Sequence, residues 1–179
     1  MNGLPALVPE DHTCAHCNLS YPEVTRDDAL DLVREVPANI RTALDDIPST
    51  RWRSRPVAGQ WSIAEYVCHV RDVYATSVLR LHRTRIEDEP LLEPMFNDLR
   101  ARRFGYNALD LNAVLTELTH NVAGLQTEAL NLTASDWRRT ASRRPGESRS
   151  ALWLLRQAGH EGKHHTSDII RLGIVAAQA

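Results

Sequence analysis

Long apolar runs are missing from this sequence, and so is any strong excess of charge of one sign. No stretch approaches the roughly 18 consecutive apolar residues of a membrane-spanning helix. Residues 1–12 lack the basic region and the apolar stretch of a secretory signal. The net charge of −2 provides no basic surface for nucleic acid. We therefore expect a cytoplasmic protein that binds a small molecule rather than a membrane or a nucleic acid.

Cysteine is scarce as well. The sequence has 3 cysteines, Cys14, Cys17 and Cys68, and this odd number does not suit the disulfide framework of a small secreted protein. A chain of 179 residues is long enough to bury a core without such cross-links. Hydrophobic residues make up 42% of the chain and charged residues 25%, as in ordinary globular domains. We expect one folded domain.

Apolar residues recur at steps of three or four nearly everywhere after residue 25, and no segment shows the period of two that is typical of strands. The pattern predicts helices over about 26–47, from Ser62 to near Glu87, and over about 107–130 and 148–172. Ser62 and Glu65 have the spacing of a capping box. Pro37 is expected to kink or split the first helix. The predicted fold class is an all-α four-helix bundle.

The two long linkers between these helices have different characters. Residues 90–106 are too many for a tight turn and suit a crossover along the bundle, which favours a non-sequential helix order. The second linker is polar and contains Arg138, Arg139, Arg143 and Arg144. We expect a packed crossover and a solvated loop. In the alternative, Met95–Tyr106 and Arg138–Arg144 cover a site and contact an anionic ligand.

Three histidines are candidate metal ligands. His160 and His164 are four residues apart on the predicted last helix, so their imidazoles face the same way and could share one ion. His69 lies in the middle of the second helix, and helical bundles build metal sites from inward side chains of facing helices. Each feature alone is also typical of ordinary core or surface histidines. Together they predict one divalent ion between His69, His160 and His164.

Nearby carboxylates could support these ligands. Asp72 follows His69 by three residues and Asp168 follows His164 by four, spacings from which a carboxylate can accept the second ring N–H. The alternative is that both are ordinary surface acids. His165 points about 100° away from His164 on an ideal helix, so we do not expect it to bind the same ion.

Residues 160–164 also fit the HExxH motif of zinc proteases, in which the glutamate is the general base. Only 15 residues follow His164, which leaves no downstream glutamate at the usual separation. The extended form of the motif fails at Ser167 and Ile170. The sequence therefore argues against a protease of this type.

Three segments carry a resemblance to a known family: Trp61–Asp72 (WSIAEYVCHVRD), Leu132–Trp137 (LTASDW) and His160–Ile169 (HEGKHHTSDI). Together they resemble the DinB/YfiT-like superfamily over nearly the whole chain after residue 25. The resemblance implies a bundle domain over 25–179 with up-down-down-up topology, often dimeric. It also implies a zinc or nickel site, whose ligands fall on His69, His160 and His164.

The family also implies an activity. Its members include thiol S-transferases and isomerases that use bacillithiol or mycothiol, and it supplies the thiol–histidine domain of sulfoxide synthases. A zinc centre with three nitrogen ligands leaves an open position at which a thiol loses its proton. We therefore expect thiol-dependent transfer or isomerisation of a small electrophile. Arginine outnumbers lysine twenty to one, which is typical of high-GC actinobacterial proteins and favours mycothiol.

Two other functions stay open. The first is a non-catalytic bundle that binds metal or responds to stress. The second is a metal-dependent hydrolase, in which the metal activates water and Glu161 or Asp72 accepts the proton.

Residues 1–24 form an N-terminal extension outside the resemblance. Its Cys14–Cys17 pair, with His16 between, is either half of a structural zinc site or a redox pair, or has no such role. A full zinc ribbon needs a second ligand pair, and none is free nearby. Cys68 is expected to be a buried apolar residue rather than a ligand.

Overall fold

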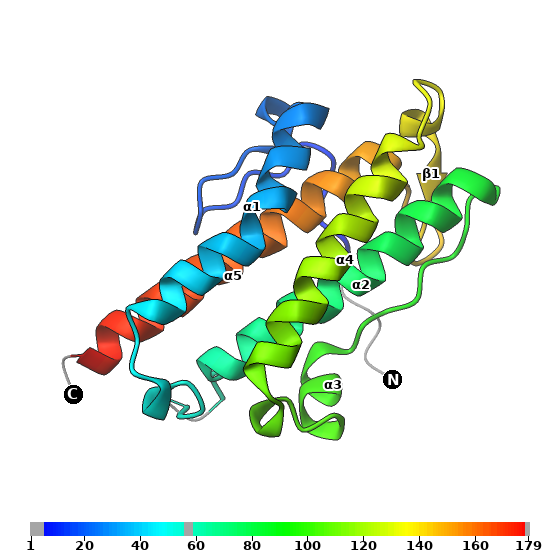
Figure 1. Cartoon of the computed structure of the whole chain (residues 1–179). Helices are drawn as coiled ribbons and strands as arrows, with labels where there is room; N and C mark the ends of the chain where they lie inside the picture. The colour runs from blue at the N-terminus through cyan, green and yellow to red at the C-terminus, as the bar shows by residue number, and fades with distance from the viewer. Residues whose placement is uncertain (1–5, 56–58, 178–179) are drawn as a thin grey trace.

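The structure, a computed structural model, describes residues 6–55 and 59–177. Four long helices dominate it: α1 (Arg26–Asp45), α2 (Ile63–Ile86), α4 (Leu111–Leu130) and α5 (Ala151–Ala177). Helix α1 packs against α5 and α4, and α2 packs against α4 and α5. Figure 1 shows α1 and α5 running one way and α2 and α4 running the other, which is an up-down-down-up order. The predicted all-α four-helix bundle is confirmed.

Short elements fill the connections. Helix α3 (Asn97–Arg103) lies in the linker between α2 and α4, and two-residue strands β1 (Thr140–Ala141) and β2 (Arg149–Ser150) pair antiparallel before α5. Single 3-10 turns, η1 to η4, cover Tyr21–Glu23, Ser49–Arg51, Tyr106–Ala108 and Asp136–Arg138. None of the helices in the described part of the chain is both long and apolar enough to cross a membrane.

Local signals explain where the helices begin. Thr25 and Asp28 form a capping box at the start of α1, and Ser62 and Glu65 form the predicted one at the start of α2. Pro37 does not split α1, because the helix continues through it to Asp45 with Pro37 buried on the core face. The helix is therefore not split, and packing along the whole of α1 outweighs the hydrogen bond that proline removes.

A close approach between α1 and α5 positions the site. A Cβ atom added to Gly162 would meet Val36 Cγ1 at 3.3 Å, and the hydroxyl oxygen of Tyr74 at 2.6 Å. Only glycine fits here, so α5 is held against α1 and α2 at the level of Glu161. Val36 and Tyr74 are themselves buried.

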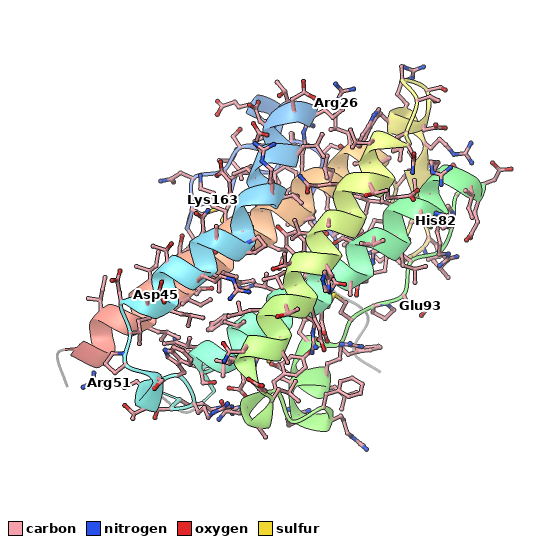
Figure 2. The ribbon with its side chains drawn as sticks, in the orientation of Figure 1. Arg26, Asp45, Arg51, His82, Glu93 and Lys163 are labelled. Carbon is pink, nitrogen blue, oxygen red and sulfur yellow. The ribbon has the colours of Figure 1, made fainter. Side chains whose placement is uncertain are left out.

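The linker that follows α2 is tied to the loop that precedes β2. The amide of Leu92 donates to the carbonyl of Ser142 at 2.7 Å, and the amide of Ser142 donates to the carbonyl of Pro90 at 3.1 Å. These bonds hold the two long linkers together along one side of α2. Figure 2 shows Glu93 on this linker beside α2.

Candidate metal centre

His69, Glu161 and His165 converge inside the bundle, and their ligand atoms all lie within 4.8 Å of one another. Oε2 of Glu161 is 3.5 Å from Nε2 of His69 and 3.2 Å from Nε2 of His165. The two imidazole rings are 4.9 Å apart at their centroids. Two imidazole nitrogens and one carboxylate oxygen around a common point suit zinc and similar divalent ions.

Helices α2 and α5 supply these side chains from facing sides. His69 is buried in the second turn of α2, where the Trp61 ring packs against it at a centroid distance of 5.0 Å. Glu161 and His165 are four residues apart on α5, so they share one face of that helix. The N–H or lone pair at Nδ1 of His69 has no hydrogen-bond partner among the described residues.

Asp168 orients His165. Its Oδ2 atom is 2.9 Å from Nδ1 of His165, and NH2 of Arg171 donates to Oδ1 at 2.6 Å. A carboxylate on Nδ1 leaves Nε2 to face Glu161 and His69, and it makes the imidazole a better electron donor. Asp168 therefore supports a histidine as predicted, but that histidine is His165, because Nε2 of His164 lies further away at 3.7 Å.

The charges of the group favour a cation at this point. Burial lowers the pKa of His165, but hydrogen bonds to Asp168 and Glu161 outweigh it and raise the pKa to about 9. Burial raises the pKa of Glu161, but His165 and His69 more than offset this and hold it far below its usual value. The carboxylates thus retain their negative charge. In the metal-free protein the protonated His165 supplies the positive charge between them, and a divalent ion would displace that proton.

The structure does not bring the predicted ligands His69, His160 and His164 into one group. His160 and His164 instead converge with Cys14 and Cys17 on another side of α5. Successive residues on a helix differ by about 100°, so the pair at 160 and 164 and the pair one residue later face different neighbours. The later pair faces α2 and His69. Glu161, predicted as a proton acceptor, thus stands among the ligand groups.

Asp72 lies away from this group. Its Oδ2 atom accepts hydrogen bonds from the hydroxyl of Tyr106 and from Arg100, at 3.0 Å from Nε and 2.6 Å from NH2. Its Oδ1 atom pairs with Arg71. Asp72 is buried and ties α2 to α3 and to the turn at Tyr106. The structure therefore gives it a role in packing rather than the catalytic role predicted from the sequence.

A cavity of about 200 Å³ opens beside the group, and His69 and Glu161 form part of its wall. Arg80 from α2 and Arg143 from the second linker also line it, and Met95 and Phe96 come from the first linker. Burial, together with the charge of Arg143, lowers the pKa of Arg80. The two linkers therefore contribute to the site instead of lying apart from it.

The family model of the DinB superfamily matches residues 32–169. The chain belongs to the DinB superfamily. The matched region contains His69, Glu161 and His165, and it leaves Cys14 and Cys17 outside. The family predicted from the sequence is confirmed.

Relatives of this DinB-superfamily chain include two proteins named as proposed metal-dependent hydrolases. The one from Geobacillus kaustophilus is 25% identical over 78% of this chain and 79% of its own length. The one from Geobacillus thermodenitrificans is 24% identical over the same shares, 78% and 79%. A link between the family and metal-dependent chemistry is thus consistent with the ligand groups found here.

Solved structures share the fold at low identity. YfiT from Bacillus subtilis, for which a metal-dependent hydrolase activity has been proposed and which has an unusual four-helix bundle topology, superposes with a TM-score of 0.81. It is 17% identical, and the match covers 96% of this chain and 94% of YfiT. A mycothiol-dependent maleylpyruvate isomerase gives a TM-score of 0.67 at 16% identity over 84% of this chain. The chain spans 63% of that isomerase, so the likeness concerns its bundle fold.

Proposed function

We propose that the protein is a metal-dependent hydrolase of a small anionic substrate, with zinc held by His69, Glu161 and His165. The observation that supports this most is the convergence of three ligand atoms within 4.8 Å of one another beside a cavity. Two histidines and one glutamate are also a ligand set of hydrolytic zinc enzymes. Three protein ligands leave room in the coordination sphere for a reactant.

The side chains have separate tasks in this proposal. When bound, zinc lowers the pKa of a water at its open position and polarises a substrate carbonyl group. Oε2 of Glu161 faces both imidazoles, and its other oxygen, Oε1, lies 3.5 Å from Nε2 of Gln157. Gln157 also lines the cavity. Oε1 of Glu161 can therefore accept a hydrogen bond from the attacking water and orient it, although the lowered pKa of Glu161 makes it a weak proton acceptor.

The cavity suggests the size and charge of the substrate. Its volume of about 200 Å³ is below the range of roughly 300 to 1,000 Å³ that is typical of pockets for drug-sized ligands. The guanidinium groups of Arg80 and Arg143 would bind a carboxylate or phosphate more tightly than a neutral group. A small anionic ester or amide fits both features.

Two chromogenic esters test the proposal. Hydrolysis of 4-nitrophenyl succinate, which is anionic, is expected to exceed that of neutral 4-nitrophenyl acetate. The His69→Ala variant should lose bound zinc and turnover together. His82→Ala is the matched control, because His82 lies near the C-terminal end of α2, as Figure 2 shows, and pairs with Glu128. Equal turnover by the His69→Ala variant, or by zinc-free protein, would reject a zinc-dependent hydrolase.

Thiol-dependent transfer is the second candidate, and the fold shared with the mycothiol-dependent isomerase favours it. The same three ligands would then hold the ion that activates a low-molecular-weight thiol. Conjugation of mycothiol to monochlorobimane, abolished by His69→Ala, would support this function over hydrolysis. Zinc binding without turnover in either assay would favour a non-catalytic metal-binding role.

A further inference from the structure

Four side chains outside the centre described above converge on a second point. Cys14 and Cys17 come from the N-terminal segment and His160 and His164 from α5, and their ligand atoms all lie within 4.8 Å of one another. Sγ of Cys14 is 3.4 Å from Nδ1 of His164. We propose that these four residues bind a second zinc ion in a structural site that fastens the N-terminal segment to α5.

The backbone around the two cysteines forms a closed turn. The amide of Cys14 donates to the carbonyl of Leu19 at 2.9 Å, and the amide of Asn18 donates to the carbonyl of Cys14 at 2.8 Å. Asn18 has a φ of 55°, in the left-handed region that asparagine tolerates well. Cys14 is buried and Cys17 is half-buried. The turn therefore holds both sulfurs close to His160 and His164 of α5, as ligands of one shared ion would be.

The surroundings of His160 also favour a metal ligand at this position. His160 is 9% exposed, and its Nδ1 atom lies 3.1 Å from the hydroxyl oxygen of Tyr21. Its other nitrogen, Nε2, is buried without a hydrogen-bond partner in the described parts of the chain. A buried polar atom without a partner is costly, and coordination to an ion would satisfy it. Tyr21, fully buried, would fix the ring and direct Nε2 toward the cysteines.

The donor set indicates both the metal and its role. Two thiolates and two imidazoles match the tetrahedral Cys₂His₂ sites of zinc, which have four protein ligands and no open position. A competing group, His16 with His164 and Asp168, would share His164. Asp168 is already engaged by His165 and Arg171, so the cysteine-containing group is the better metal site.

The site would act on the first centre through the N-terminal segment. Leu7, from this segment, lines the cavity beside His69 and Glu161. The segment is also attached through Leu19 and Tyr21, which lie in the hydrophobic core, and by hydrogen bonds to α5, such as that from Nε1 of Trp153 to the carbonyl of Pro9 at 3.2 Å. Zinc would add a strong cross-link between two parts of the chain far apart in sequence, and so hold one wall of the cavity in place.

Metal analysis of the full chain, purified without chelator, tests the proposal. We expect two zinc ions per chain in the wild type and one in the Cys14→Ser/Cys17→Ser variant. Cys68→Ala is the matched control, because Cys68 is buried between helices and belongs to neither group, and it should keep both ions. His69→Ala should also keep one ion, the sulfur-bound one, so loss of the first centre is distinguishable from absence of the second.

X-ray absorption at the zinc edge gives a test that does not require the cysteine variant to fold. Wild-type protein should show zinc–sulfur scattering at about 2.3 Å together with nitrogen ligands. This signal should persist in His69→Ala. A spectrum with only nitrogen and oxygen ligands in both proteins would overturn the proposal. A disulfide between Cys14 and Cys17 in protein purified under reducing conditions, found by peptide mass analysis, would overturn it as well.

Discussion

Nδ1 of His165 lies 2.9 Å from Oδ2 of Asp168, one turn further along α5. This contact determines which nitrogen of His165 faces Glu161 and His69. It also explains why a carboxylate that the metal does not touch should affect metal affinity, since the ring loses both its orientation and its electron donation without it.

Asp168→Asn should therefore weaken zinc binding at the first centre by roughly 10- to 100-fold, as is typical when the carboxylate behind a ligating histidine is removed. Competition with a chromophoric chelator measures the affinity, with His69→Ala defining the zinc held elsewhere. Asp31→Asn is a suitable control, because Asp31 is an exposed residue of α1 that pairs with Arg34. Equal affinities of Asp168→Asn and the wild type would show that Asp168 does not support a metal ligand.

Gly162→Ala tests the close approach that places Glu161. The added methyl group would meet the Tyr74 hydroxyl at 2.6 Å and Val36 closer still, so we expect a loss of about 1–3 kcal/mol in the free energy of unfolding. Gly124→Ala in α4 is the control, since its nearest neighbour would be Val78 Cγ2 at an ordinary 3.5 Å. That variant should gain up to about 1 kcal/mol from helix propensity. Urea unfolding of both variants gives the comparison, and equal effects would contradict a tight contact at Gly162.

The candidate metal-binding histidines show which parts of the site could be predicted from the sequence and which could not. Periodicity located the four long helices, and the family pattern placed metal ligands on α2 and α5. The sequence did not reveal which face of α5 meets α2, because the pair His160 and His164 and the pair Glu161 and His165 have the same spacing. The contact of Gly162 with α1 and α2 decides between them, and it is a tertiary contact that local pattern does not encode.

Two other features could not be predicted from the sequence, for similar reasons. Helix α3 was not predicted, since it has seven residues and begins after Phe96, whose left-handed backbone and apolar side chain provide no capping signal. The pairing of Cys14 and Cys17 with His160 and His164 joins residues about 140 positions apart along the chain. The CxxC spacing is typical of half of a metal site, but His160 and His164 were assigned together with His69 to a different site. Only the packing of the N-terminal segment on α5 brings the halves together.

The start of α2 predicts a pH dependence of stability. Glu65 is buried; burial raises its pKa, but Arg55 and the amide of Ser62 outweigh this and lower it. A carboxyl group with a lowered pKa in the folded state stabilises the protein above its ordinary pKa, about 4.3, and this contribution is lost as the pH falls through the folded-state pKa. The fall in unfolding free energy between pH 5 and pH 3 should therefore be smaller in Glu65→Gln than in the wild type. Urea unfolding at several pH values measures this fall. An equal fall in the two proteins would show that the lowered pKa of Glu65 does not contribute to stability.

Arg80 should determine the preference for an anionic substrate. Its Nε atom is buried without a hydrogen-bond partner among the described residues, while NH2 donates to the carbonyl of Glu93 at 2.6 Å, so the guanidinium is held at the cavity with a donor to spare. A hydrogen bond to a charged group contributes about 1.5–3 kcal/mol, which corresponds to roughly a 10- to 100-fold change in binding. Arg80→Met should raise the dissociation constant of succinate by this factor in calorimetric titration, with zinc content unchanged. Arg34→Met, which removes an exposed pair with Asp31 on α1, should leave it unaltered. Because the two variants lose the same charge, an equal effect of both would mean that the net charge of the protein, rather than a contact inside the cavity, attracts the anion.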